Sequence, residues 1–222
     1  MNTVKLLDKD NPQDLNDLKL ILKEYVQDEL EQNNPVYMAE YLEKFASWIL
    51  NRFQRCAKSN FVVAANYYDG DLVQIMVGYT FDIAWGNDLA LDTTPYWYVG
   101  LAYFKDKHWR NPGKEIIDLG LALGAHFERK GYYKFYTVKK MPNRIKTYDD
   151  LQKYINSPAY KTTFQVKRYH PKVEKIFRTT DDLTAFRFIH WSVILPRGIT
   201  RPIMLIEYTL DPTIDIAAIM KQ

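Results

Sequence analysis

The chain has 222 residues, of which 47% are hydrophobic and 26% are charged, and its formal net charge is +3. This length favours a single domain that buries a proper core. No apolar run of about 18 residues occurs, and charged residues begin at Lys5. The sequence therefore supports neither a membrane span nor a signal peptide, and we expect a soluble, cytoplasmic protein.

The positions of the cysteine and the histidines in the sequence match neither a metal site nor a catalytic nucleophile motif. Cys56 is the single cysteine, which excludes an internal disulfide, and its apolar helical surroundings indicate a buried structural thiol. The histidines show no metal-ligand spacing, so we expect no metal site. They are His108, His126, His170 and His190. No Gly-x-Ser-x-Gly or P-loop motif occurs either.

Charge is distributed unevenly along the chain. Residues 1–31 contain eight Asp or Glu against four Lys or Arg, whereas residues 129–178 contain fourteen Lys or Arg against three Asp or Glu. The later segment predicts a basic face, which suits cofactor phosphates, nucleic acid or an acidic protein surface. A solvated face with no special partner is the alternative interpretation.

Two helices are predicted near the N-terminus, after a short strand at Val4–Leu7. Asn11-Pro12 and Asn34-Pro35 each combine a helix N-cap residue with proline at the first helical position. The first helix should end near Glu31 and the second near Lys58. Both have apolar residues at helical spacing, so each is expected to bury one face.

A β-hairpin is predicted next. Phe61–Tyr68 and Asp71–Trp85 are strand-like runs separated by Asp69-Gly70, a dipeptide that favours tight hairpin turns. Gly78 interrupts the second run, which indicates a β-bulge or the close approach of another group. A polar loop, residues 86–94, follows.

The most regular pattern of the chain is a βαβ unit. It consists of a strand at Tyr96–Phe104, a helix from Pro112 to about Lys130 closed by Gly131, and a strand at Tyr132–Val138. Because βαβ crossovers are right-handed and join parallel strands, we expect these two strands to be parallel.

The turn before this helix has the chemistry of a phosphate site. The first amide N–H groups of a helix lack intrahelical partners and lie at the positive end of its dipole. Arg110, Lys114 and the amides after Gly113 could converge on a phosphate there. An ordinary capped crossover helix is the alternative, and the local pattern by itself favours it.

The remainder of the chain is less regular. A basic loop (residues 139–147) and a short helix (Tyr148–Ile155) precede strand-like runs at 173–178, 185–195 and 202–210. The last two runs flank the turn Pro196-Arg197-Gly198 and are expected to form a closing hairpin. We predict that residues 1–222 form one domain.

The order of these elements resembles the GNAT acetyltransferase superfamily. FVVAANYYDGDLVQIMVGYTFDI is similar to the family's second and third strands, and HWRNPGKEIIDLGLALGAHFERKGYYKFYTV is similar to its motif A and following strand. Arg110 and Gly113 match the first arginine and first glycine of the family's R-x-x-G-x-G/A motif. The best-matched core is residues 1–138, and residues 139–222 are a diverged, basic C-terminal elaboration. The resemblance implies an α/β (α+β) fold with a mixed, strongly twisted sheet of about six to seven strands.

The resemblance also implies an acetyl-CoA site where the fourth and fifth strands splay apart. Amides near the end of the fourth strand would bind pantetheine, and those at the helix start would bind the pyrophosphate. The implied contacts come from Phe104, Lys105, Asp106, Arg110, Asn111, Gly113 and Lys114. Two positions depart from the family pattern. Glu115 stands at the second glycine or alanine and places an anion beside the phosphate site, and Pro112 removes one donor amide.

Acetyl transfer to an amine requires a base for the ammonium proton and an acid for the leaving thiolate. In the family the acid is usually a tyrosine on the helix after the fifth strand, which implies Tyr154 or Tyr160 here. Asp82 and Asp106 are the candidate bases, and a surface carboxylate is the alternative interpretation of each.

Three functions are compatible with these features. The first is an acetyl-CoA-dependent N-acyltransferase acting on an amine of a small molecule or a protein. The second is a catalytically inactive GNAT-fold module that binds a protein partner or forms a homo-oligomer, which Glu115 and the basic segment favour. The third, ranked last, is nucleic-acid binding through residues 129–178, where aromatic and basic residues are interleaved.

Overall fold

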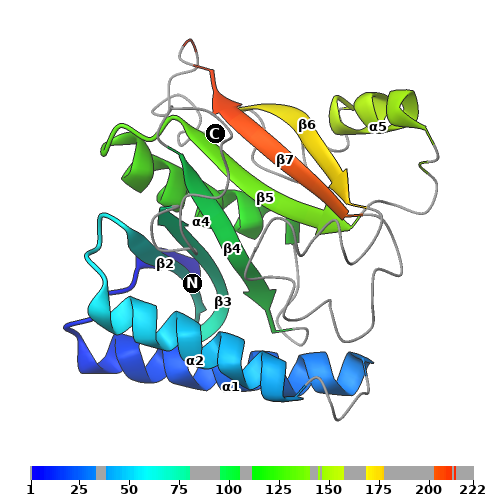
Figure 1. Ribbon diagram of the computed structural model, residues 1–222. Helices are drawn as coiled ribbons and strands as arrows, with labels where there is room; N and C mark the ends of the chain where they lie inside the picture. Colours follow the sequence, from blue (N-terminus) through cyan, green and yellow to red (C-terminus); the bar gives the residue numbers. More distant parts are fainter. Residues whose placement is uncertain are drawn as a thin grey trace.

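The described part of the computed structural model forms a seven-stranded sheet with helices on both faces (Figure 1). None of the described helices is long and apolar enough to cross a membrane. The residues that the structure describes are 2–33, 39–80, 96–105, 112–140, 145, 147–157, 169–177, 203–211 and 213.

The sheet is mixed, as the sequence predicted. Its strands lie in the order β1-β2-β3-β4-β5-β7-β6. β4 and β5 are parallel, whereas the other neighbouring pairs are antiparallel. The strands are β1 (Asn2–Leu6), β2 (Phe61–Tyr68), β3 (Asp71–Thr80), β4 (Trp97–Phe104), β5 (Lys134–Lys140), β6 (Tyr169–Phe177) and β7 (Ile203–Leu210).

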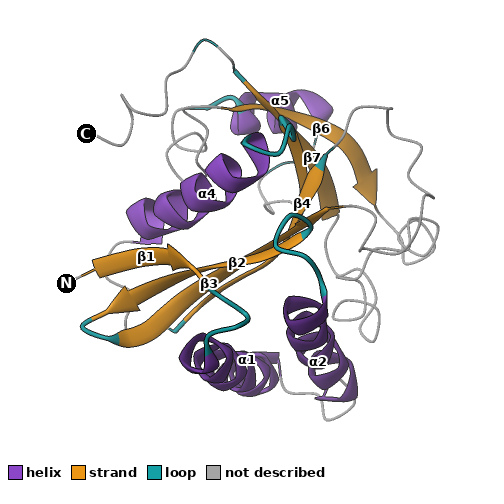
Figure 2. Cartoon of the chain, turned by 90° about the vertical axis from the view of Figure 1, so that its left-hand side faces the viewer, coloured by secondary structure: helices purple, strands orange, loops and turns teal. Residues whose placement is uncertain are grey.

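The helices divide the molecule into three layers (Figure 2). α1 (Pro12–Asn33) and α2 (Ala39–Arg55) cover one face of the sheet, and α4 (Pro112–Glu128) covers the other face and joins β4 to β5. α5 (Tyr148–Ile155) packs against β6. Because successive strand residues point to opposite faces, one strand serves both cores: Val63 lies in the core under α1 and α2, and Val62 lies in the core under α4.

Several local signals in the sequence produce the predicted backbone. The Asn11 side chain accepts a hydrogen bond from the Gln13 N–H at 2.9 Å, which caps α1. Asp69 and Gly70 both have positive φ, at 50° and 93°, as a type I′ hairpin turn requires. Gly131 has a φ of 86° where α4 ends. The Asn11 cap, the Asp69-Gly70 turn and the helix end at Gly131 are therefore confirmed, whereas Asn34-Pro35, Asn111 and the turn at 196–198 lie outside the described residues.

The predicted closing hairpin of residues 185–195 and 202–210 is wrong. β7 pairs with β5 along one edge and with β6 along the other, and a strand has only two edges. β6 thus occupies the place assigned to residues 185–195, which lie outside the described residues. Pro171 interrupts the strand-like pattern of β6, but β6 is an edge strand, where proline is tolerated.

Candidate functional site

The strands β4 and β5 diverge soon after they begin (Figure 1). Their residues pair only at Trp97↔Phe135 and Tyr98↔Tyr136. Both strands then continue, β4 to Phe104 and β5 to Lys140, without pairing to each other. The backbones of the two strands thus diverge as a V with Tyr98 and Tyr136 at its apex, and we call this gap in the backbone pairing of the sheet the opening.

A β-bulge in β4 lies next to this apex. The register between β3 and β4 shifts between Val77 and Gly78, which leaves Gly100 of β4 without a partner residue on β3. A bulge bends and twists its strand, so β4 turns away from β5 just beyond the last paired residue. Glycine is needed at this position because a Cβ on Gly100 would overlap Cε1 of Tyr79.

Beyond Tyr98, the edge of β4 that faces β5 directs backbone N–H groups into the opening. The Lys105 N–H donates to the Val73 carbonyl of β3 at 3.0 Å. Backbone N–H groups of successive strand residues point to alternate sides. The N–H groups of Phe104 and Ala102 therefore point away from β3 and into the opening, and Ala102 is exposed.

The structure thus distinguishes among the residues predicted to bind pantetheine. Phe104 directs its amide into the opening, whereas Lys105 uses its amide within the sheet and pairs its ammonium with Glu24 of α1 at 2.8 Å. Sequence reasoning missed Ala102. The available signal was a small residue within an aromatic strand, at the same alternation as Phe104.

The predicted pyrophosphate residues are only partly described. Asp106, Arg110 and Asn111 lie outside the described residues, so their roles stay predictions. Gly113, Lys114 and Glu115 belong to the first turn of α4, of which the structure describes the backbone.

The candidate acids and bases are not brought together in the described part of the chain. Tyr154 lies on α5, which packs against the edge strand β6. Since β7 separates β6 from β5, and strands lie about 4.8 Å apart, β6 is about 10 Å beyond the β5 side of the opening. Tyr160, Asp82 and Asp106 lie outside the described residues and stay predictions.

Two tyrosines at the apex have different chemistry. Tyr98 is fully buried, and this burial raises its pKa well above the usual value, so its hydroxyl stays protonated at neutral pH and does not act as a base. The Tyr136 hydroxyl donates to the Glu207 carboxylate on β7, and Lys134 Nζ lies 3.3 Å from the same carboxylate oxygen. Sequence reasoning missed Glu207, although it is the single charged residue of β7.

Carboxylates of α1 border the other side of the opening. The Tyr103 hydroxyl donates to Asp28, and Lys105 pairs with Glu24. Asp28 and Glu24 are only partly buried. The carboxyl end of β4 therefore lies beside an acidic section of α1.

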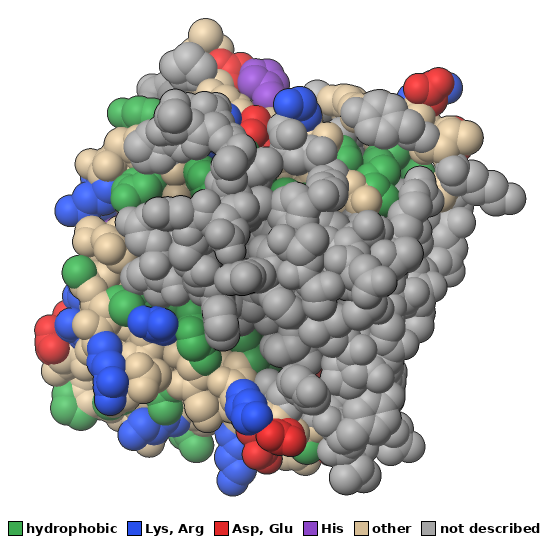
Figure 3. Space-filling model, in the orientation of Figure 1, with side chains coloured by type: hydrophobic (Ala, Val, Ile, Leu, Met, Phe, Trp, Pro, Cys, Tyr) green, Lys and Arg blue, Asp and Glu red, His purple; other side chains and the backbone are tan. Residues whose placement is uncertain are grey.

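Figure 3 shows the distribution of charge on the face seen in Figure 1. Over the described residues of this face, Lys and Arg side chains are mixed with Asp and Glu side chains instead of gathering in one basic patch. Much of the basic segment 129–178 lies outside the described residues. The predicted basic face and C-terminal elaboration therefore stay predictions.

Sequence comparison finds no relative, whereas structure comparison finds many. No protein-family profile and no curated protein matches the chain. The aminoglycoside 6'-N-acetyltransferase from Enterococcus faecium superposes with a TM-score of 0.55 at 12% identity, over 96% of this chain and 99% of that chain. An aminoglycoside 6'-N-acetyltransferase complexed with coenzyme A gives a TM-score of 0.52 at 12% identity, with the same coverage. The chain has the GNAT acetyltransferase fold.

A third GNAT-fold structure agrees with the other two. The PaiA N-acetyltransferase from Thermoplasma acidophilum, in complex with coenzyme A, superposes with a TM-score of 0.50 at 10% identity, over 93% of this chain and 99% of that chain. At sequence identities this low, the structural similarity establishes the shared fold and not a shared activity. The activity has to be argued from the opening between β4 and β5.

Proposed function

We propose that this protein is an acetyl-CoA-dependent N-acyltransferase, with the cofactor bound between β4 and β5. The observation that carries the proposal is the V-shaped opening, into which the N–H groups of Phe104 and Ala102 point. Beyond Tyr98, β4 does not pair with β5, and this edge of β4 suits the amide carbonyls of a pantetheine arm, which would pair with β4 as an added strand does. Coenzyme A is bound by two of the GNAT-fold structures that this chain resembles.

An amine is the acceptor that the surroundings of the opening favour. The carboxylates of Glu24 and Asp28 on α1 flank the carboxyl end of β4 and attract a cationic group. Acetyl-CoA, when bound, would supply the acetyl thioester. The chain would supply a base for the ammonium proton and an acid that protonates the leaving thiolate and then takes back the remaining excess proton of the acylated nitrogen.

The proton-transfer residues are a separate part of the proposal. Asp82, Asp106 and Tyr160 remain candidates from the sequence. Tyr154 is less suitable because α5 packs at the far edge of the sheet. Glu207 is an additional candidate base, since its carboxylate is bound by Tyr136 at the apex.

A second candidate function is an inactive GNAT-fold module that assembles with a protein partner or with itself. Glu115 and Pro112 favour it, because they add an anion and remove a donor at the predicted pyrophosphate turn. The distance of α5 from the opening favours it as well.

Calorimetric titration with acetyl-CoA distinguishes the two functions. A working site binds acetyl-CoA, binds it more weakly in Arg110→Ala, and binds it more tightly in Glu115→Ala, because the second variant removes a like charge from the pyrophosphate. Alanine is preferred to glycine at position 115, since glycine destabilises a helix by roughly 0.5–1 kcal/mol. If wild type and both variants bind no cofactor, the assembly function replaces the enzymatic one.

A further inference from the structure

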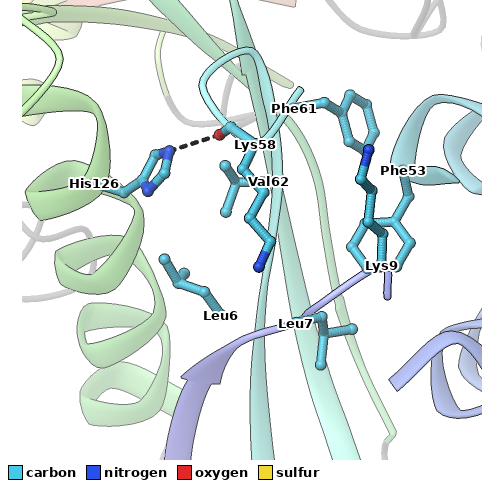
Figure 4. A pocket seen from close by; sticks show the side chains of 8 residues that line it. All are labelled: Leu6, Leu7, Lys9, Phe53, Lys58, Phe61, Val62 and His126. Carbon is cyan, nitrogen blue, oxygen red and sulfur yellow. Dashed lines mark hydrogen bonds between the residues drawn. The ribbon is translucent and has the colours of Figure 1, made fainter. Parts of the chain in front are cut away.

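A cavity lies apart from the opening, at the edge of the sheet where β1 ends (Figure 4). Its volume is about 110 Å³. Side chains of Leu6, Leu7, Phe53, Phe61 and Val62 provide an apolar lining. None of these five residues belongs to β4 or β5, so the cavity is separate from the proposed cofactor site.

The cavity exists because β1 is shorter than its neighbour β2. The last registered pair is Leu6↔Ala64, and one further hydrogen bond joins the Leu7 N–H to the Val63 carbonyl at 2.9 Å. Among the described strands, none therefore lies beside Phe61 and Val62, the first residues of β2, on this side. Helices from both faces of the sheet approach this gap: α2 contributes Phe53, and α4 contributes His126.

Positively charged groups line the rest of the cavity. Lys9 and Lys58 both belong to its wall (Figure 4). Lys9 Nζ donates to the Cys56 carbonyl at 3.3 Å, and Lys58 Nζ pairs with the Asp8 carboxylate at 2.9 Å. The wall therefore has two ammonium groups, and the Asp8 carboxylate is the anion paired with one of them. The Lys58 side chain is 53% exposed and can turn toward a ligand.

His126 adds a neutral ring to this wall. Its Nε2–H donates to the Lys58 carbonyl at 2.7 Å. Burial lowers the pKa of the ring, and the positive charges of Arg129, Lys130 and Lys58 lower it further. The two lysines that line the cavity, Lys9 and Lys58, favour an anionic ligand there.

We propose that this cavity binds a small organic anion, a monocarboxylate with a compact apolar body. At about 110 Å³ the cavity is smaller than the apolar cavity of about 150 Å³ that holds benzene. Because it opens to solvent, a ring of that size enters it in part, with its carboxylate directed outward. The apolar lining takes the ring, and the ammonium groups of Lys9 and Lys58 donate charge-assisted hydrogen bonds to the carboxylate.

Three probes with one shape and different charges test this proposal. Benzoate is an anion, benzamide is its neutral counterpart, and benzamidine is the matching cation. Each is titrated into the full chain labelled with ¹⁵N, and backbone amide shifts are followed. Benzoate should shift the amides of Leu7, Val62 and His126 and should bind about threefold or more tightly than benzamide. Benzamidine should bind most weakly.

Charge-removing variants complete the test. Lys9→Gln combined with Lys58→Gln should lower the affinity for benzoate to that for benzamide. Lys19→Gln removes the same charge from an exposed position of α1 and should leave benzoate binding unchanged. If the double variant does not fold, Lys9→Gln alone is measured and should lose about half of the preference for benzoate. Equal affinities for the three probes, shifts confined to other residues, or no shifts would overturn the proposal.

Discussion

Gly100 is the residue on which the shape of the opening most directly depends. It is the unpaired residue of the β4 bulge, and the ring of Tyr79 occupies the space of a Cβ. Gly100→Ala should therefore lower the free energy of unfolding by about 1–3 kcal/mol, the usual cost of inserting a methyl group into a packed core. Urea unfolding measures this change.

Ala102→Ser is the matched control for that substitution. Ala102 lies two residues away on the same strand and is exposed, so its stability should change by no more than about 0.5 kcal/mol. If Gly100→Ala is as stable as the control, the contact with Tyr79 is not a constraint on the bulge.

His126 makes stability depend on pH. Its pKa in the folded protein is lowered, mainly by burial, although its hydrogen bond to the Lys58 carbonyl opposes this effect. Below about pH 6.5 the unfolded chain consequently binds more protons than the folded chain at this residue, so the free energy of unfolding falls as the pH falls. His126→Gln should reduce this dependence. Urea unfolding of both proteins from about pH 7.5 to about pH 5 measures it, and equal slopes would contradict the assignment.

At the scale of the elements, the end of α4 determines how β5 enters the sheet. The Tyr132 N–H donates to the Phe127 carbonyl at 3.0 Å, and the Gly131 N–H donates to the Glu128 carbonyl at 2.9 Å. With the positive φ of Gly131, these bonds form a Schellman motif. The motif ends the helix and starts the turn toward Lys134.

Gly131→Ala should destabilise the protein by about 1 kcal/mol, because alanine is strained at positive φ. For a chain of this size, the melting temperature should fall by about 2–4 °C. Gly131→Asn is the control, since asparagine tolerates this conformation better, and it should lose less. Calorimetry of the three proteins measures the order, and an alanine variant as stable as wild type would rule out the motif as a constraint.

Sequence reasoning was accurate for elements defined by local chemistry. Asn11-Pro12, Asp69-Gly70 and Gly131 each specify a backbone conformation through neighbouring residues, and the structure has these conformations. Strand pairing depends on residues far apart in sequence. The partner of β7 was therefore assigned wrongly: the turn Pro196-Arg197-Gly198 favoured the run 185–195, whereas the run 173–178 belongs largely to β6, which pairs with β7.

In the candidate site, too, one prediction is confirmed, whereas features that depend on residues far apart in sequence were missed. The splaying of the fourth and fifth strands, which the resemblance implied, is confirmed. The contribution of each β4 amide depends on the pairing of β4 with β3, so the sequence could not separate Phe104 from Lys105. Glu207 was missed because only the folded sheet brings it beside Tyr136.

At the scale of the whole molecule, two cores hold the two halves of the opening in place. One core lies under α1 and α2, the other lies under α4, and strands on both sides of the opening contribute to both cores. Side-chain packing on both faces of the sheet therefore holds the opening in place. Its proposed occupant is the pantetheine arm of acetyl-CoA.

Amide hydrogen exchange at two neighbouring residues tests this central claim most directly. The Lys105 N–H is bonded to Val73 and should exchange slowly with or without acetyl-CoA. The Phe104 N–H points into the opening and should exchange markedly more slowly once acetyl-CoA is added, as should that of Ala102. Unchanged exchange at Phe104 and Ala102 in the presence of millimolar acetyl-CoA would contradict cofactor binding between β4 and β5.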